Sequence, residues 1–214
     1  RGKKDKDLAK LLELNNVKAL EIDILDENQI ASLDNNYYFI FQLAAIVGVQ
    51  NVVNKPYDTL YKNFLINHNS LKLALKQKSL KRFIFTSTSE VQSSSSNVID
   101  MLYPTPENFP IIIPDLNMKR STYMLSKIYG EAMCIHNEVP SLIFRPHNIY
   151  GPRMGMSHVI PELLYRIRNA KKNEILEINS FTHKRAFCFI DDAVALMQGA
   201  LENINNKISN QILN

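Results

Sequence analysis

The sequence predicts an α/β protein built on a doubly wound parallel sheet with helices on both faces. Two features of its 214 residues carry this prediction: the strand-length segments are continuous apolar runs, and helical segments separate them along the chain. Strands without polar alternation are typical of a sheet that is buried on both faces. Ligands of such sheets bind beyond the carboxyl ends of the strands, so side chains that directly follow a strand are the first candidates for a site.

Helices are expected where apolar residues recur at spacings of three and four, and strands where short apolar runs are rich in β-branched and aromatic residues. The expected helices lie at residues 5–16, 27–34, 57–78, 121–138, 160–172 and 191–204. The expected strands lie at residues 17–24, 37–45, 82–87, 141–146, 174–178, 186–190 and 210–214. The proline-dotted stretch of residues 89–120 contains a run of serines, and we expect it to be a loop rather than a linker between domains.

Composition narrows the function. A chain of this length can bury a sizeable core in one or two domains, and its net charge of +4 is mild. No window approaches the ~18 apolar residues of a membrane-spanning helix, and no signal peptide opens the chain, so we expect no membrane association. Cys134, Cys188, His147 and His158 lie in no metal-type spacing, which predicts free thiols, no metal site and a reducing, cytoplasmic location. The basic clusters lack interleaved aromatic residues, which argues against nucleic-acid binding.

One expected motif is absent. Doubly wound folds that bind dinucleotides normally carry G-x-G-x-x-G in the first turn between strand and helix, where glycine lets backbone amides approach the pyrophosphate. None of the six glycines of this chain forms that motif. Either the fold binds no dinucleotide or the chain begins after that turn. The charged opening and the strand-like close at "NQILN" favour the second alternative, with truncation at both ends.

A candidate catalytic pair lies in the segment "RSTYMLSKIYGEA". Tyr123 and Lys127 are four residues apart on an expected helix, so both side chains project from the same face. A phenol with a pKa near ~10 is a poor base at neutral pH unless a nearby cation stabilises the phenolate. Lys127 would supply that cation. The spacing alone also fits a packed tyrosine beside a solvated lysine.

Further polar residues follow expected strands. Hydroxyls and a carboxylate occupy residues 86–90, directly after the run "FIF". Arg145, Asn148 and Arg153 follow the next strand in "RPHNIYGPR", and Arg185 opens "RAFCFIDD". Arginine and amide groups that converge on one edge of a sheet suit a pyrophosphate, because they donate bidentate hydrogen bonds.

These segments together resemble the extended short-chain dehydrogenase/reductase family, in particular its NAD-dependent nucleotide-sugar epimerases and dehydratases. The matching segments, in family order, are "EIDILD", "FQLAAIVGV", "KPYDTLYKNFLIN", "RFIFTSTSE", "YMLSK", "LIFRPHNIYGPR" and "RAFCFIDDAVALM". The resemblance covers nearly the whole chain. It implies a Rossmann-like fold without its first strand and glycine-rich turn, the cofactor NAD, and a nucleotide-diphosphate sugar as substrate.

The resemblance also implies a domain division and roles for individual residues. Residues 1–150 would form the NAD-binding Rossmann-like domain, residues 151–190 part of a substrate-binding region, and residues 191–214 a helix and strand that return to the first domain. Homodimers would form through helices 57–78 and 121–138. The implied catalytic residues are Tyr123, Lys127, Thr88 and Glu90. The implied cofactor-binding residues are Asp23, Ile24, Leu43, Ala44, Ala45, Asn63, Tyr123 and Lys127. The implied substrate-binding residues are Ser89, Glu90, Asn148 and Arg185.

In the mechanism that this resemblance implies, Tyr123 removes the proton of the sugar 4-hydroxyl while a hydride passes to NAD. The triplet Thr88, Ser89 and Glu90 resembles that of GDP-mannose dehydratases and UDP-glucuronate decarboxylases, so epimerisation, dehydration and decarboxylation all stay open. Two positions depart from the family pattern: Gln42 replaces a histidine, and Gln92 lies where a tyrosine is usual.

Two other hypotheses compete with this one. The chain could be a reductase of a non-nucleotide ketone, although such a substrate offers no anion to the arginines. It could also be a non-catalytic cofactor-binding or scaffold protein that keeps the fold, although an intact catalytic pair argues against degeneration.

Overall fold

The computed structural model describes residues 5–113, 115–178, 185–202 and 211–214. Its main sheet has four parallel strands in the order β1-β2-β3-β6, which confirms the α/β prediction. These strands are β1 (Phe39–Gln42), β2 (Arg82–Thr86), β3 (Ser141–Phe144) and β6 (Gln211–Leu213). All four carboxyl ends lie at one edge, because every pairing is parallel.

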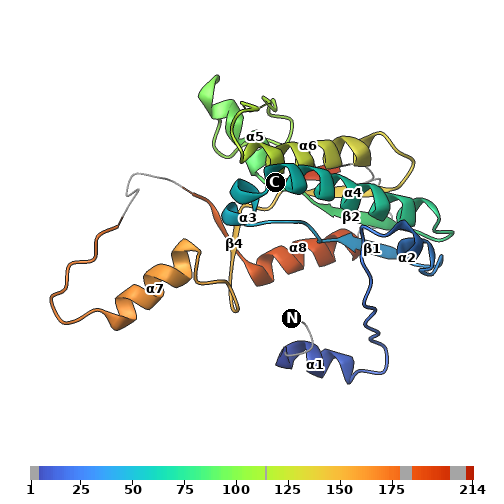
Figure 1. Ribbon diagram of the computed structural model, residues 1–214, viewed down its shortest axis with the longest axis horizontal. Helices are drawn as coiled ribbons and strands as arrows, with labels where there is room; N and C mark the ends of the chain where they lie inside the picture. Colours follow the sequence, from blue (N-terminus) through green and yellow to red (C-terminus); the bar gives the residue numbers. More distant parts are fainter. Residues whose placement is uncertain (1–4, 114, 179–184, 203–210) are drawn as a thin grey trace.

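Helices cover both faces of this sheet (Figure 1). On one face, α4 (Pro56–Leu75) and α6 (Ser121–Ile135) pack over Phe83, Phe85 and Ile143. On the other face, α8 (Ile190–Glu202) packs over Ile84 and its neighbours. Successive residues of β2 thus face opposite cores, which explains its unbroken apolar run. Each fully buried apolar side chain of this size contributes roughly 1.5–3 kcal/mol relative to exposure.

A second, smaller sheet pairs β4 (Asn148–Tyr150) with β5 (Phe187–Phe189) in parallel. Between these strands the chain runs through α7 (Val159–Asn169), which has no buried residue and projects away from the main sheet in Figure 1. Three further helices are α1 (Lys6–Leu12), α2 (Glu27–Ala31) and α3 (Val49–Asn54), of which α3 was not predicted.

Two expected strands are wrong. Residues 17–24 and 174–178 form no strand, and most of their side chains are exposed or only partly buried. A strand is stable only when a neighbour satisfies its backbone groups, and neither segment pairs with any strand of the described residues. Local composition cannot supply that partner.

A loop was predicted for the run of serines, but this segment is helical. Glu90–Ser93 forms the short helix α5, and Ser94–Asn97 continues it as the 3₁₀ helix η2. Val91, Gln92 and Ser95 are buried. The first part of the 89–120 stretch is therefore packed structure.

Gly130 lets α6 approach both α4 and the sheet. A Cβ at this position would lie 2.4 Å from Cζ of Phe85 and 2.7 Å from Nδ2 of Asn67, both of which are buried. Neither neighbour can move without disturbing the core, so a side chain here would overpack the interface.

We predict that Gly130→Ala lowers the free energy of unfolding by about 1–3 kcal/mol, because overpacking outweighs the gain in helix propensity. Gly199→Ala is the matched control, since a Cβ on Gly199 in α8 meets nothing within 4 Å. The control should gain about 0.5–1 kcal/mol. Urea unfolding followed by circular dichroism measures both changes, and equal effects at the two glycines would contradict the packing role of Gly130.

Candidate active site

Helix α6 brings Tyr123 and Lys127 to the carboxyl end of β2. Lys127 is only 4% exposed, and its Nζ donates a hydrogen bond of 2.6 Å to the carbonyl oxygen of Thr86, the last residue of the strand. The same Nζ lies 5.1 Å from the ring centre of Phe85 and 5.9 Å from that of Tyr123. The pair expected from the sequence therefore lies at the edge where ligands of parallel sheets bind.

Burial shifts the pKa values of both members of this pair. Burial, followed by the negative charge of Glu90, raises the pKa of Tyr123 to about 12. Burial lowers the pKa of Lys127 to about 8, while the carboxylate of Glu131 acts in the opposite direction. At pH 7 the phenol is therefore protonated and the ammonium is still largely charged. Tyr123 needs additional positive charge near its oxygen before it can act as a base.

The turn after β2 carries Thr88, Ser89 and Glu90, and it lies against the turn after β3. The backbone N–H of Ser89 donates to the carbonyl oxygen of Pro146 at 3.1 Å, and that of Glu90 donates to Oγ1 of Thr88 at 3.3 Å. The Glu90 carboxylate pairs with Arg120 at 3.1 Å near the surface. Because all three triplet side chains are partly exposed, a ligand at this edge can reach them.

The loop after β1 carries Leu43, Ala44 and Ala45, and a buried amide holds it in place. Asn63 on α4 accepts a hydrogen bond from the backbone N–H of Ile46 at 2.7 Å and donates one to the carbonyl oxygen of the same residue at 3.1 Å. Asn63 thus attaches the loop to α4. Leu43 is exposed and Ala44 and Ala45 are partly exposed, so a cofactor at this edge can reach the loop.

Asp23 and Ile24 lie in a turn that is also attached to α4. Oδ1 of Asp23 accepts a hydrogen bond from the backbone N–H of Leu25 at 2.9 Å, and Asn69 Nδ2 donates to the carbonyl oxygen of Ile24 at 2.7 Å. Asn69 follows Asn63 by six residues on α4. At ~1.5 Å per residue, the two anchor points are about 9 Å apart along the helix axis. The segments expected to meet the adenine and the rest of the cofactor are therefore arranged along one helix.

Two buried oxygen atoms at neighbouring strand ends lack a hydrogen-bond partner among the described residues. They are Oε1 of Gln42, the last residue of β1, and Oγ1 of Thr86, the last residue of β2. Buried polar atoms are normally satisfied, so a water or a polar ligand that reached these two atoms would gain a hydrogen bond. Together with the accessible loop after β1, these atoms fit part of a dinucleotide site.

The second sheet holds the residues expected to bind the diphosphate. Nδ2 of Asn148 donates to the carbonyl oxygen of Ala186 at 3.0 Å, and Arg185 directly precedes that residue in the chain. Asn148 and Arg185 are both exposed. The pairing of β4 with β5 thus brings together two residues that are far apart in the sequence.

The other two arginines of the expected cluster are used elsewhere, which corrects that part of the prediction. Arg145 is buried and forms a bidentate ion pair with Glu131. Arg153 forms ion pairs with Asp5 and Asp7, which flank the start of α1. The Arg145 guanidinium is therefore not free for a diphosphate, whereas that of Arg153 is exposed and is held only by surface ion pairs.

Several residues at this edge were missed. Gln92 was noted only as a departure from the family pattern, although it is buried and holds a neighbouring segment. Asn67 and Ser126 connect α4 to α6 through a hydrogen bond of 3.2 Å between the Asn67 amide and the Ser126 carbonyl oxygen. A signal for Glu131 did exist, because residues 123, 127 and 131 recur every four positions and share one face of α6.

Other parts of the described chain differ from this edge in character. An open, apolar cavity of about 580 Å³ lies on the opposite side of the sheet along α8, and none of the site residues lines it. The described residues contain no group of three His, Cys, Asp or Glu side chains arranged to hold a metal ion. None of the described helices combines the length and apolar character needed to cross a membrane.

Comparison with known proteins supports the resemblance. The model of the NAD dependent epimerase/dehydratase family matches residues 2–214. A UDP-N-acetyl-alpha-D-glucosaminuronate decarboxylase from Bacillus cytotoxicus is 31% identical over 203 residues, which are 93% of this chain and 60% of that protein. The chain therefore spans about three fifths of the length of this relative.

Solved structures agree. UDP-glucuronic acid 4-epimerase from Bacillus cereus, in complex with UDP-glucuronic acid and NAD, has a TM-score of 0.74 at 25% identity, covering 97% of this chain and 63% of that chain. A dTDP-glucose 4,6-dehydratase from Streptomyces venezuelae shares the fold, with a TM-score of 0.74 at 20% identity over 96% of this chain and 60% of that chain. Because the family model matches almost every residue, the chain belongs to the NAD-dependent epimerase/dehydratase family, whose cofactor is NAD.

Proposed function

We propose that this chain is the main part of an NAD-dependent enzyme that acts on a nucleotide-diphosphate sugar through transient oxidation at the sugar C4. The observation that carries this proposal is the position of Tyr123 and Lys127 at the carboxyl end of β2, beside Thr88 and Glu90. Asp23, Ile24, Leu43, Ala44, Ala45 and Asn63 form or support the cofactor half of the site. Ser89, Asn148 and Arg185 belong to the substrate half.

Tyr123 is the proposed base. Its Oη takes the proton of the sugar 4-hydroxyl, and Thr88 Oγ1 orients that hydroxyl. Bound NAD would supply the hydride acceptor for C4. Lys127 stabilises the phenolate. One of its three N–H donors binds the carbonyl oxygen of Thr86, which leaves two N–H donors for the ligand.

The C4 ketone then determines which products are possible. Return of the hydride to the other face of the sugar gives the epimer. If the sugar carries a carboxylate at C6, that carboxylate is β to the ketone, so the C5–C6 bond can break. Carbon dioxide leaves, and the electron pair passes to the C4 oxygen as an enolate. This route needs no dedicated carboxylate base, so Glu90 is not required for it.

Two observations favour a UDP-linked hexuronic acid as the first candidate substrate. The relative that is 31% identical is a decarboxylase named for a UDP-linked hexosaminuronate, and a structural neighbour at 25% identity binds UDP-glucuronic acid. The triplet Thr88, Ser89 and Glu90 resembles that of UDP-glucuronate decarboxylases. Decarboxylation is therefore the second candidate reaction beside epimerisation or dehydration.

Product masses distinguish these reactions. The full-length protein with NAD is incubated with UDP-glucuronic acid, UDP-N-acetylglucosaminuronic acid, UDP-glucose, dTDP-glucose and GDP-mannose. An unchanged mass with altered chromatographic retention identifies epimerisation, loss of water identifies dehydration, and loss of carbon dioxide identifies decarboxylation. We expect conversion of a UDP-linked uronic acid. Failure to convert or bind any of the five would refute the nucleotide-sugar proposal.

Replacing Tyr123 with phenylalanine tests its role as base. We predict that Tyr123→Phe lowers kcat by roughly 10²–10⁴-fold, as for loss of a general base, while UDP binding changes less than about twofold. Tyr129→Phe is the control, because Tyr129 lies on the same helix but is half exposed and keeps its ring contact with Phe64. Steady-state kinetics and calorimetric titration with UDP provide the measurements. Near-normal turnover by Tyr123→Phe would remove Tyr123 from the mechanism.

The pH dependence of kcat/KM tests the pairing with Lys127. The phenol pKa is raised to about 12, so the phenolate fraction, and with it kcat/KM, should rise about tenfold per pH unit on the acidic side. The pKa of Lys127 is lowered to about 8, so its charge is lost above that pH and the rise should flatten or reverse there. In Lys127→Arg the cation persists, and we expect the break near pH 8 to disappear. If the break near pH 8 persists in Lys127→Arg, it arises from the titration of another group.

A further inference from the structure

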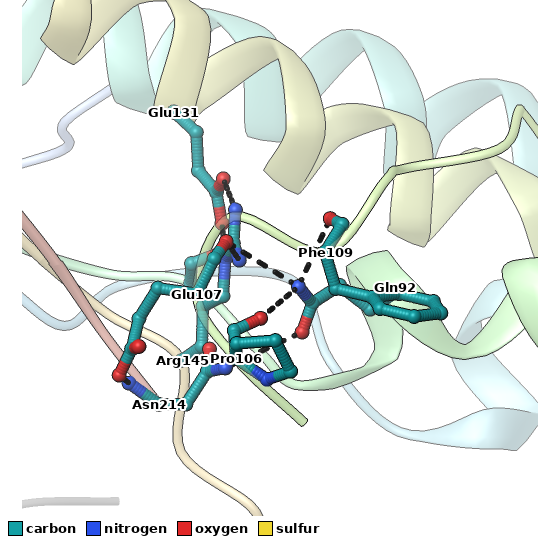
Figure 2. A network of polar contacts seen from close by, with 8 residues as sticks. Gln92, Pro106, Glu107, Phe109, Glu131, Arg145 and Asn214 are labelled. Carbon is teal, nitrogen blue, oxygen red and sulfur yellow. Dashed lines mark hydrogen bonds and ion pairs between the residues drawn. The ribbon is translucent and has the colours of Figure 1, made fainter. Parts of the chain in front are cut away.

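Gln92 uses its buried side-chain amide to hold a segment that is distant in the sequence. It lies on α5, two residues after Glu90, and is 2% exposed. Nε2 donates to the carbonyl oxygens of Pro106 at 3.1 Å and Phe109 at 3.2 Å, and that of Glu107 lies at 3.4 Å (Figure 2). An amide nitrogen has only two N–H groups, so three carbonyls share them.

The segment of residues 105–110 crosses the carboxyl ends of β3 and β6. Arg145 follows β3, and its Nη1 donates to the carbonyl oxygen of Glu107 at 3.0 Å. Asn214 follows β6: its Nδ2 donates to the carbonyl oxygen of Thr105 at 2.8 Å, and its backbone N–H donates to Oε1 of Glu107 at 3.2 Å. The segment is thereby fixed at the edge where ligands of a parallel sheet bind.

A second side chain from the run of serines extends this attachment. Ser95 is fully buried; its Oγ donates to the carbonyl oxygen of Pro110 at 2.7 Å and accepts a hydrogen bond from the backbone N–H of Ile112 at 3.2 Å. Gln92 and Ser95 together hold the backbone on both sides of Pro110. Gln92 and Ser95 thus fix the backbone of residues 105–112, although composition predicts a loop there. Residues 105–110 are called the wall below.

The same wall is connected to the catalytic helix. Arg145, which binds the carbonyl oxygen of Glu107, also forms the ion pair with Glu131 on α6, two turns after Tyr123. Gln92 lies on the short helix that begins with Glu90. A shift of residues 105–110 would therefore act on Glu131 of α6, through Arg145, and on the short helix that begins with Glu90, through Gln92. The loop after β1, which Asn63 holds, would stay in place.

We propose that Gln92 is a positioning residue that determines how the sugar, as distinct from the nucleotide, is held. Its amide keeps residues 105–110 in place as one wall of the sugar pocket beside the triplet. This proposal rests on the function proposed above. It assigns a role to Gln92, which lies where the family pattern has a tyrosine. It also predicts that the sugar part of the binding free energy depends on the Gln92 side chain, although this side chain does not touch the substrate.

The test compares the full-length protein with Gln92→Met, which keeps the side-chain length but cannot donate hydrogen bonds. Calorimetric titrations with UDP and with UDP-glucuronic acid, both at saturating NAD, separate the nucleotide from the sugar contribution. We expect at least a tenfold weaker affinity for UDP-glucuronic acid, a similar rise in KM, and a change of less than twofold for UDP. Gln92→Glu, which also removes the donor, should behave in the same way.

Ser96→Ala is the matched control, because Ser96 is exposed and its Oγ donates only to the nearby carbonyl oxygen of Ser93. It should leave both affinities unchanged. If Gln92→Met does not fold, Gln92→Asn, which keeps the amide on a shorter chain, replaces it and should weaken sugar binding by a smaller factor. Equal weakening of UDP and UDP-glucuronic acid, or unchanged affinity for both, overturns the role of Gln92. A wild-type protein that binds neither ligand instead refutes the proposed substrate.

Discussion

The ligand edge of this protein depends on one buried ion pair, between Glu131 on α6 and Arg145 after β3. Two charge-assisted hydrogen bonds of 2.8 and 2.7 Å join the side chains, and Ser87, just after β2, donates a further bond of 2.5 Å to Glu131. A buried pair adds little net stability, but loss of one partner costs about 3–5 kcal/mol, because it leaves an uncompensated charge. The pair therefore enforces geometry: it fixes α6 relative to the ends of two strands.

The same carboxylate also acts on the pKa of Lys127. Glu131 lies one turn after Lys127, and its negative charge opposes the lowering of the Lys127 pKa by burial. Arg145 binds both oxygens of that carboxylate and so holds it at a fixed position. The charge that Lys127 offers to Tyr123 thus depends on a residue that need not touch any ligand. The structural role of Glu131 and its electrostatic effect on Lys127 therefore depend on the same buried charge.

Sequence patterns predicted the elements whose cause is local and missed those whose cause is a distant partner. The apolar run of β2 and the spacing of Tyr123 and Lys127 are local features, and the structure contains both. Residues 17–24 have the composition of a strand, but pairing is not a local property. Ser95 is polar in sequence yet buried, because the backbone at Pro110 and Ile112 supplies its partners. Arg145 was read as a ligand group because its acidic partner was not apparent from neighbouring residues.

Helix α6 is consequently held from two sides by polar contacts, in an interface that apolar residues alone could have filled. On one side, Asn67 donates to the Ser126 carbonyl oxygen and Asn63 donates to the Ser126 hydroxyl at 3.3 Å. Directional bonds of this kind specify one register between α4 and α6, whereas apolar packing tolerates several. On the other side, Glu131 and Arg145 specify its position above the strands. The loop after β1 is tied to the first side through Asn63, and residues 105–110 are tied to the second through Arg145, so α6 fixes the relative position of these two segments.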